Sequence, residues 1–229
     1  MEIADILSKV REEGRALLSY EEGKRVLEMW GIPVVPSRVA TDGAGAREAA
    51  RFLGFPVVMK VLSPDIVHKS DVGGVVTDLR TEEEAGRAFE IMMENAKERK
   101  PTARIQGVIV EKMLEGVEAI IGVTKESQFG HVLMFGMGGV LVELLKDTSF
   151  RLIPIEPGDA EDMMREVRGY VLLEGFRGRR ADIESLKGLL LKISDLIIHY
   201  PEIAGIDLNP VIASPSGSIV ADVRIQMDG

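Results

Sequence analysis

The sequence contains no cysteine, which excludes disulfide bonds, thiolate metal sites and cysteine nucleophiles. Basic residues are in the minority as well: 28 lysines and arginines stand against 37 aspartates and glutamates, and the formal charge is −9. Nucleic-acid grooves and membrane-surface patches need a surplus of basic residues. We therefore expect the protein to bind neither nucleic acid nor a membrane surface.

Long hydrophobic runs are also missing. The longest nearly apolar stretch, residues 132–145, contains three glycines and Glu143, and it is shorter than the about 20 residues that a membrane span needs. Residues 1–13 carry charged side chains among their apolar positions, unlike the apolar core of a signal peptide. These absences predict a cytoplasmic protein.

The sequence does contain alternating helical and strand patterns, which are typical of an α/β or α+β fold. We predict helices over residues 1–30 (in two pieces, interrupted near Gly14 and Gly23), 44–53, 81–97, 159–167 and 182–199. Thr81 and Glu84 form the pattern of a capping box at the start of the third of these helices. Strands are predicted over 32–39, 55–62, 75–79, 107–114, 117–124, 130–145 (two strands around a glycine turn) and 203–225 (a hairpin).

The closing hairpin allows the sharpest inference. If its strands are antiparallel and Ile212 faces Ile219 across the loop 213–218, opposed residue numbers sum to 431. Directly opposed residues point to the same side of a sheet, so one side carries two polar pairs, Asn209 with Asp222 and Asp207 with Arg224. The other side carries apolar residues suited to a core: Ile206, Leu208, Ala221, Val223 and Ile225.

The polar side of this hairpin gathers two carboxylates, an amide and a guanidinium. Hard oxygen ligands without histidine or cysteine suit Mg²⁺, which accepts one or two protein oxygens and takes the rest from phosphate and water. Asn209 and Asp222 are therefore candidate magnesium ligands. The alternative is an ordinary exposed strand face with a salt bridge, and the hairpin alone does not decide between the two.

Candidate phosphate-binding groups lie in the first half of the chain, although no Walker A sequence is present. Lys60 ends the apolar run 55–60, and a cation at the end of a buried strand needs either a partner such as phosphate or access to water. Gly73 and Gly74 follow in a long loop, where paired glycines let backbone amides approach an anion closely.

Candidate nucleoside-binding groups follow a later strand. Glu111, Lys112 and Met113 leave the strand in a crossover segment whose main chain can offer donors and acceptors to a purine edge. Glu118, seven residues beyond Glu111, can hold ribose hydroxyls. By themselves these residues are only candidates for a nucleotide site.

The site segments resemble the nucleotide and Mg²⁺ sites of an ATP-grasp fold: residues 58–60, 111–114 with Glu118, and 207–210 with Asp222. More narrowly, the whole chain resembles the β subunit of ADP-forming acyl-CoA (acetyl-CoA) synthetase, a relative of succinyl-CoA synthetase. The closer match is carried by residues 68–75, 135–143, 150–152 and 173–178 and by the closing hairpin. His131 departs from the family pattern, and it is not one of the predicted site residues.

The resemblance implies a reversible reaction in which acyl-CoA, ADP and inorganic phosphate give acid, CoA and ATP. In this family the α subunit holds the CoA site and a histidine that becomes phosphorylated, and the β subunit binds ADP or ATP between two lobes. A second histidine, on a mobile β-subunit loop, relays the phosphoryl group, and His68 matches it. The isolated chain is then expected to bind nucleotide and to need the α subunit, in an α₂β₂ assembly, for turnover.

The resemblance also assigns roles to the other site residues. Asp207 would orient the imidazole of His68, and Gly73 and Gly74 would serve as the hinge of its loop. Lys60 and Mg²⁺, the latter held by the hairpin, would neutralise charge as the phosphoryl group moves.

The implied fold is an α+β ATP-grasp fold of two α/β lobes. Residues 21–111 would form the smaller lobe, which carries Lys60 and the His68 loop. Residues 1–20 and 112–229 would form the larger lobe, which carries the metal-binding hairpin, and the crossing between lobes is expected within residues 110–116.

Alternatives remain open at this point. One is an ATP-grasp carboxylate ligase that works through an acyl phosphate without a phosphohistidine, and another is a nucleotide-sensing module without catalysis. Arg151 could contact phosphate or pair with Asp147, and the sequence does not choose between these two roles. His131 and His199 are expected to be structural.

Overall fold

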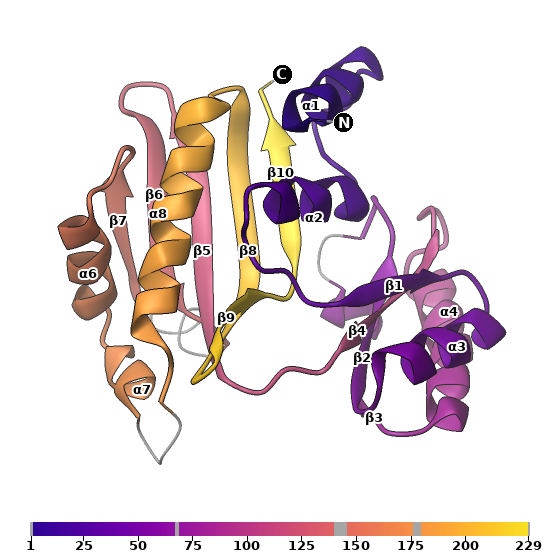
Figure 1. Cartoon of the computed structure of the whole chain (residues 1–229). Coiled ribbons are helices and arrows are strands. Elements are labelled where there is room, and N and C mark those ends of the chain that lie inside the picture. The colour runs from indigo at the N-terminus through magenta and orange to yellow at the C-terminus, as the bar shows by residue number, and fades with distance from the viewer. Residues whose placement is uncertain (1, 67–68, 140–145, 176–179, 229) are drawn as a thin grey trace. The chain divides into compact units, whose positions relative to one another are not determined.

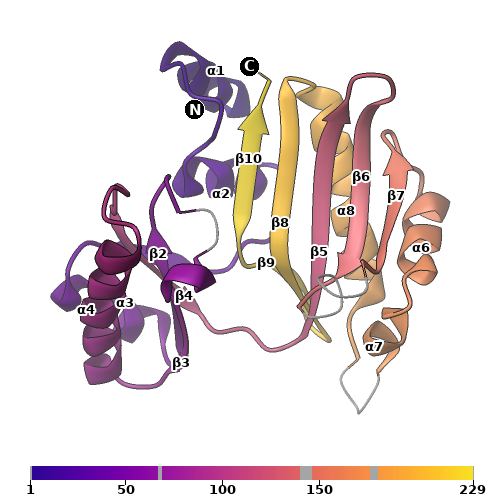
Figure 2. The same ribbon diagram turned by 180° about the vertical axis from the view of Figure 1, so that it is seen from behind.

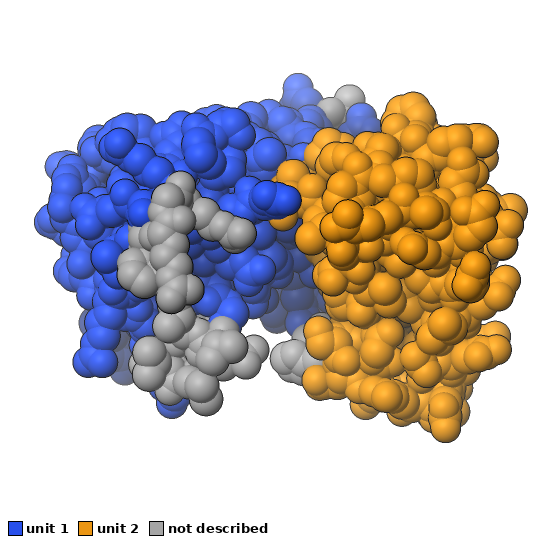
Figure 3. Space-filling view, turned by 90° about the horizontal axis from the view of Figure 1, so that it is seen from below, with its two compact units in different colours: residues 1–34, 115–229 blue, residues 35–114 orange. Residues whose placement is uncertain are grey.

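The computed structural model describes residues 2–66, 69–139, 146–175 and 180–228. The chain divides into two compact units, residues 1–34 with 115–229 (unit 1) and residues 35–114 (unit 2), as Figures 1 and 3 show. The chain passes from unit 2 back to unit 1 between Leu114 and Glu115, inside the expected segment 110–116. The predicted smaller lobe shares residues 35–111 with unit 2, whereas residues 21–34 belong to unit 1 because the second helix packs on its sheet.

Unit 1 is built on an antiparallel sheet with the strand order β10–β8–β5–β6–β7, and β9 pairs with β8. Its strands are β5 (Val117–Glu126), β6 (Gly130–Met137), β7 (Thr148–Leu152), β8 (Ile203–Ser214), β9 (Gly217–Val220) and β10 (Val223–Met227). Its helices are α1 (Ile3–Glu12), α2 (Tyr20–Met29), α6 (Pro157–Glu166), α7 (Tyr170–Glu174) and α8 (Ile183–His199).

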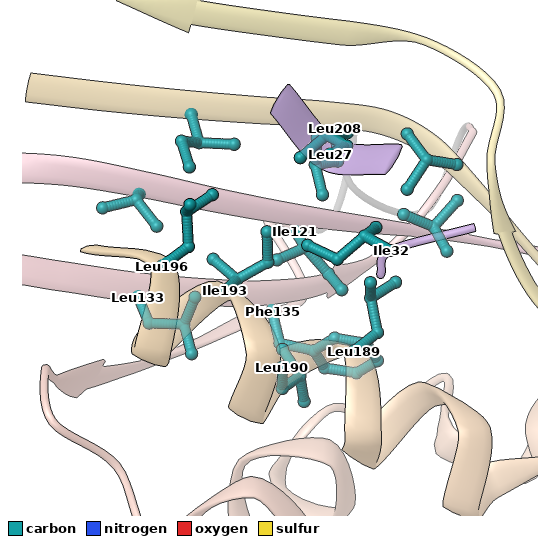
Figure 4. Close-up of a cluster of buried hydrophobic side chains, with 14 of the residues drawn as sticks. Leu27, Ile32, Ile121, Leu133, Phe135, Leu189, Leu190, Ile193, Leu196 and Leu208 are labelled. Atoms are coloured by element: carbon teal, nitrogen blue, oxygen red, sulfur yellow. The ribbon is translucent and has the colours of Figure 1, made fainter. Parts of the chain in front are cut away.

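The core of unit 1 lies between this sheet and the helices α2, α6 and α8 (Figure 1). Alternate residues of β5 and β6 are buried toward α8, among them Ile121, Leu133 and Phe135, and they pack against leucines and isoleucines of that helix (Figure 4). We call the opposite side of the sheet the open face. Among the residues of unit 1 that the structure describes, no helix covers it (Figure 2).

Unit 2 is a smaller sheet with two helices on one side. The strand order is β1–β4–β2–β3, and the paired strands run antiparallel. The elements are β1 (Ser37–Ala40), α3 (Gly43–Leu53), β2 (Val57–Leu62), the 3₁₀ turn η1 (Ser70–Val72), β3 (Val75–Leu79), α4 (Glu82–Arg99) and β4 (Gly107–Lys112). Val57, Met59 and Val61 of β2 face the core with α3 and α4, so Lys60 belongs to the other side of the sheet.

The N-terminal helices differ from the prediction at one of the two glycines. Gly14 has a positive φ of 65° and ends the first helical piece, as expected. Gly23 lies inside α2 and brings that helix close to β10, where an added Cβ would lie 3.5 Å from Val223.

Arg15 and Glu22 form an ion pair of 2.8 Å, and the hydrogen bond from the guanidinium lowers the pKa of Glu22 to about 2.

Two further expectations are corrected. The strand expected over 32–39 is reduced to Ser37–Ala40, because Pro33 and Pro36 have no N–H to donate to a ladder. The Thr81 hydroxyl does cap α4 by accepting from Glu84 N–H (3.1 Å), but the Glu84 carboxylate accepts from Arg80 N–H.

Over the described ranges, no helix combines the length and apolarity that a membrane span requires.

Candidate functional site

The closing hairpin has the register that the sequence predicts. β8 pairs with β9 through Ile212 and Ile219 and with β10 through Asp207 and Arg224. In both pairs the residue numbers sum to 431, so the predicted register is confirmed from the loop to the pair of Gly205 with Gln226; it shifts by one residue at Ile203 and Met227. The loop is shorter than expected, because β8 continues to Ser214 and its hydroxyl accepts the N–H of Ser216 (3.2 Å).

Asn209 and Asp222 lie opposite each other at the point where β9 ends and β10 begins. The Ala221 N–H donates to the Pro210 carbonyl (2.9 Å), which carries the same register across the gap between β9 and β10. Asn209 is exposed and Asp222 is half-buried. The Asp222 carboxylate accepts the N–H of Val223 (3.0 Å), which fixes the position of one of its oxygens.

A β-bulge shapes this part of β8, and the sequence analysis did not anticipate it. Leu208 and Val211 pair with β5 residues that are only two positions apart, so Asn209 and Pro210 together oppose one residue. The bulge lets both Leu208 and Val211 reach the core, where each is fully buried. Without it Val211 would point to the same side as Asn209. Bulges of this kind occur next to functional sites because they re-aim side chains.

The amide of Asn209 and the carboxylate of Asp222 fit a small hard cation. Mg²⁺ is held by one or two protein oxygens and otherwise by phosphate and water, and this hairpin supplies two oxygen-bearing side chains. Within the described part of the chain, no group of three or more histidines, cysteines or acidic residues could hold a metal by itself. A cation at this hairpin would therefore need the phosphates of a nucleotide to complete its coordination.

Asp207 lies in the middle of the open face. Its Cα neighbours across the ladders are Arg224 on β10 and Gly122 on β5, and its side chain is exposed. Asp207 thus has an arginine as its neighbour on one strand and a glycine, which has no side chain, as its neighbour on the other. His68, the residue that Asp207 is predicted to orient, lies outside the described residues.

Glu118 lies at the start of β5, opposite Ile212 of β8. The N–H of Gly138 donates to the Glu118 carbonyl (2.7 Å), and a Cβ added at Gly138 would lie only 2.7 Å from the Glu118 Cβ. Only glycine permits this approach. The glycines after β6 therefore bring the backbone directly against the candidate ribose-binding residue.

In unit 2, Lys60 forms a buried ion pair with Glu111. The ammonium of Lys60 lies 2.7 Å from the Glu111 carboxylate, and both residues are less than a tenth exposed. Lys60 pairs with Ile109 on β4, so Glu111 is its diagonal neighbour on the side of the sheet away from α3 and α4. The structure thus shows a partner for the cation that the sequence analysis, which considered phosphate or water, did not foresee.

This ion pair makes Lys60→Met a test of stability as well as of binding. The substitution removes the nearest cation from a buried carboxylate, which typically costs about 3–5 kcal/mol. We expect a matching loss in the free energy of unfolding by denaturant titration. The double variant Lys60→Met/Glu111→Leu removes both charges and is expected to recover most of the stability but no nucleotide binding. Equal stability of the single variant and the wild type would contradict the pair's structural role.

The segment after Glu111 is anchored more tightly than the sequence analysis supposes. The ammonium of Lys112 donates to the carbonyls of Gly54 (2.8 Å) and Phe55 (3.0 Å). The backbone N–H groups of Lys112 and Met113 donate to proline carbonyls at 3.1 Å each. The side chain of Lys112 therefore holds this segment on unit 2, and a purine edge would have to use the segment's remaining main-chain groups.

The two loop glycines are also held in place. Gly73 has a φ of 65° and ends η1. The N–H of Gly74 donates to the Lys69 carbonyl (2.8 Å), and its own carbonyl accepts from Val61 (2.8 Å). A Cβ at Gly74 would lie 2.5 Å from the Val61 side chain. Gly74 thus fastens the loop to β2 by close packing, and its N–H is used inside the loop in this structure.

Arg151 has a different partner from either of those considered. Its guanidinium pairs with Glu166 of α6 (2.6 Å), and the hydrogen bonds from Arg151 lower the pKa of the Glu166 carboxyl. Asp147 is buried and accepts the N–H groups of Arg168 (2.8 Å) and Gly169 (2.7 Å). Neither pairing could be read from sequence spacing, because both depend on how the chain after β7 returns to the sheet.

Comparison with known proteins shows what this chain is similar to. Residues 9–227 match the model of the ATP-grasp domain. The β subunit of acetate–CoA ligase [ADP-forming] I from Pyrococcus furiosus is 43% identical over 96% of this chain and 96% of its own length. Acetate–CoA ligase [ADP-forming] I from Archaeoglobus fulgidus is 46% identical over 96% of this chain, which spans only 32% of that longer protein.

Solved structures of acetyl-coenzyme A synthetase 1 from Ca. Korarchaeum cryptofilum are similar as well. A complex with coenzyme A and Ca-AMPCP has a TM-score of 0.92 at 46% identity, covering 98% of this chain and 99% of that one. A complex with coenzyme A and Mg-AMPPCP, in which a phosphohistidine segment points towards the nucleotide binding site, has a TM-score of 0.84 at 43% identity, covering 99% and 100%.

The fold and the family model define an ATP-grasp protein. Within this class, the match over nearly the full length of both chains places the protein in the family of β subunits of ADP-forming acetate–CoA ligases. The expected α+β ATP-grasp fold and the resemblance seen in the sequence are both confirmed.

Proposed function

We propose that this chain is the nucleotide-binding subunit of an ADP-forming acyl-CoA synthetase, in which acyl-CoA, ADP and phosphate give acid, CoA and ATP. The observation that carries the proposal is the hairpin of β8, β9 and β10. Its confirmed register sets Asn209 opposite Asp222 and Asp207 opposite Arg224, and the relatives at 43–46% identity are ligases of this kind.

The candidate nucleotide-binding residues would keep the roles that the family resemblance implies. Lys60 would meet its phosphates, the segment 111–113 would meet the base, and Glu118 would hold the ribose. Asn209 and Asp222 would hold Mg²⁺, which when bound supplies charge neutralisation and alignment of the phosphates. An ammonium already paired with a carboxylate, as Lys60 is with Glu111, is held in one position before the nucleotide arrives.

His68 would carry the phosphoryl group. An imidazole is neutral and nucleophilic near pH 7, so a ring nitrogen can form a bond to phosphorus as the bond to the partner's histidine breaks. The phosphoryl group then passes to a terminal oxygen of ADP, and the His68 imidazole is released unchanged. Asp207 would accept the other ring N–H of His68 and so set its tautomer.

The partner would be an α subunit that carries the CoA site and a phosphorylatable histidine, in an α₂β₂ assembly. Relatives in which a matching segment forms about a third of a longer chain support the need for further domains. Gly73 and Gly74, at the base of the His68 loop, would serve as its hinge. The reaction would take place in the cytoplasm.

The test is reconstitution with the α subunit in the presence of acetyl-CoA, labelled phosphate, ADP and Mg²⁺. We expect ATP formation only when both subunits are present, with acid-labile label on the β chain when ADP is left out. Turnover by this chain alone, or nucleotide binding without turnover in the presence of the α subunit, would contradict the proposal. The latter result would favour a nucleotide-sensing module.

A further inference from the structure

Two rows of side chains cross the open face of unit 1, and they follow from the strand registers. The first row runs from β10 to β7 through Arg224, Asp207, Gly122, Met134 and Phe150. The second row, one pleat away, runs through Gln226, Gly205, Thr124, Val132 and Leu152. Both rows begin with a polar side chain on β10 and end with apolar side chains on β6 and β7. Between these ends each row contains one glycine, Gly122 on β5 in the first and Gly205 on β8 in the second.

All residues of these rows except Leu152 line a hollow of about 660 Å³ on the open face. Gly122 and Gly205 lie on its floor and have no side chains, so the surface drops there. Its apolar end is lined by Val132, Met134 and Phe150. Leu152 lies beside Val132 on β7, and we call these four residues the β6–β7 shelf. Phe150 and Leu152 are 55% and 53% exposed.

The shelf exists because the polarity of β7 is inverted. Ser149 is buried and its hydroxyl donates to the Met163 carbonyl of α6 (2.6 Å), and Arg151 pairs with Glu166 of the same helix. The polar residues of β7 therefore point to the helix side, and its large apolar residues point outward. An edge strand that served only the core would have the opposite pattern. Adjacent exposed apolar side chains of this size mark an interaction surface.

The polar end of the same hollow belongs to the proposed phosphoryl-transfer site. Asp207 on β8 is three strands from Phe150 on β7, and with a strand spacing of about 4.8 Å the two ends are about 14 Å apart. A partner that delivers a phosphoryl group to the surroundings of Asp207 must approach the open face. A protein seated on the shelf would reach that carboxylate along the floor of the hollow.

We propose that the β6–β7 shelf is the docking surface of the α subunit on this chain. This inference rests on the proposed function, because the occupant is the subunit that donates the phosphoryl group. The choice of occupant follows from the continuity of the shelf with the Asp207–Arg224 pair in one hollow and from relatives in which the rest of the enzyme is joined to the matching segment. Phe150 would be its main anchor, since buried aromatic residues dominate such interfaces.

The test uses the double variant Phe150→Ser/Leu152→Ser, whose side chains lie outside the core of unit 1. Its affinity for the separately expressed α subunit is measured by calorimetry and compared with that of Ile198→Ser. Ile198 is similarly exposed, at 52%, and lies on α8 on the other side of the sheet. We expect the double variant to bind the α subunit about tenfold or more weaker and Ile198→Ser to bind like the wild type.

Two further measurements distinguish a loss of α-subunit binding from a loss of nucleotide binding or catalysis. Mg-ADP affinity of the isolated double variant is expected to be unchanged, and its turnover is expected to recover at high α-subunit concentration. The docking proposal would be overturned if the double variant kept its α-subunit affinity or lost its Mg-ADP affinity. It would also be overturned if the wild-type chain self-associated in sedimentation and the double variant did not, because the shelf would then bind a second copy of this chain. Wild-type chain that binds the α subunit without forming ATP would instead contradict the proposed function and leave the affinity comparison intact.

Discussion

His68→Ala is expected to lower ATP formation by the reconstituted enzyme by about 10³-fold or more, because it removes the nucleophile proposed to accept the phosphoryl group. Phosphorylation of the α subunit from acetyl-CoA and phosphate should continue, since that step does not use this chain's imidazole. The measurement is a pair of half-reactions, label on the α subunit and label in ATP. Only the second is expected to fail.

His199→Ala is the matched control for this variant. His199 is exposed at the end of α8 and packs beside Trp30, with ring centroids 5.1 Å apart, so its loss tests the general effect of removing an imidazole. We expect nearly wild-type turnover from it. If His68→Ala kept wild-type turnover, the phosphoryl group would pass to ADP without a relay on this chain, as in an ATP-grasp ligase that uses no phosphohistidine.

Asp222→Asn has the second large expected effect. Asparagine keeps an oxygen that can accept the Val223 N–H, as the carboxylate does at 3.0 Å, so the hairpin should fold normally. It removes the one negative charge of the candidate cation site, and we expect about 10²-fold weaker Mg-ADP binding and a comparable loss of turnover. Titration of the isolated chain with ADP at several Mg²⁺ concentrations measures the change.

Magnesium-dependence distinguishes a ligand from a residue that only shapes the hairpin. The loss in affinity should shrink when ADP is titrated without Mg²⁺, because the wild type then has no cation to hold. Asp195→Asn, an exposed carboxylate on α8, should leave both titrations unchanged. A Mg²⁺-independent loss in Asp222→Asn would show that Asp222 does not hold the ion.

The hairpin that carries Asp207, Asn209 and Asp222 was predictable from the sequence because its geometry is local. A hairpin with a short polar loop and alternating apolar residues has few possible registers, and a shift of one residue would bury Asp207 and Arg224. The register, the apolar side at Leu208 and the ATP-grasp resemblance could therefore all be read from the sequence. The bulge at Asn209 could not, because it depends on how β8 pairs with β5, a strand about 90 residues earlier in the chain.

Contacts between distant strands and helices were decided only by the tertiary structure. The pair of Lys60 with Glu111 requires β2 and β4 to be neighbours, and the sequence pattern makes both segments strands without saying which lie side by side. The same holds for Arg151 with Glu166, which exists because α6 packs on β7.

By itself, the sequence determined most of the strands, although not β7 or the bounds of β1. It also determined which side of each hairpin strand is polar and which family the chain resembles, because these depend on periodicity and short spacing. The tertiary structure alone decided which charges meet and which apolar side chains stay outside. The β6–β7 shelf shows the difference. Its residues alternate like core residues, and only the position of α6 turns Phe150 and Leu152 to the open face.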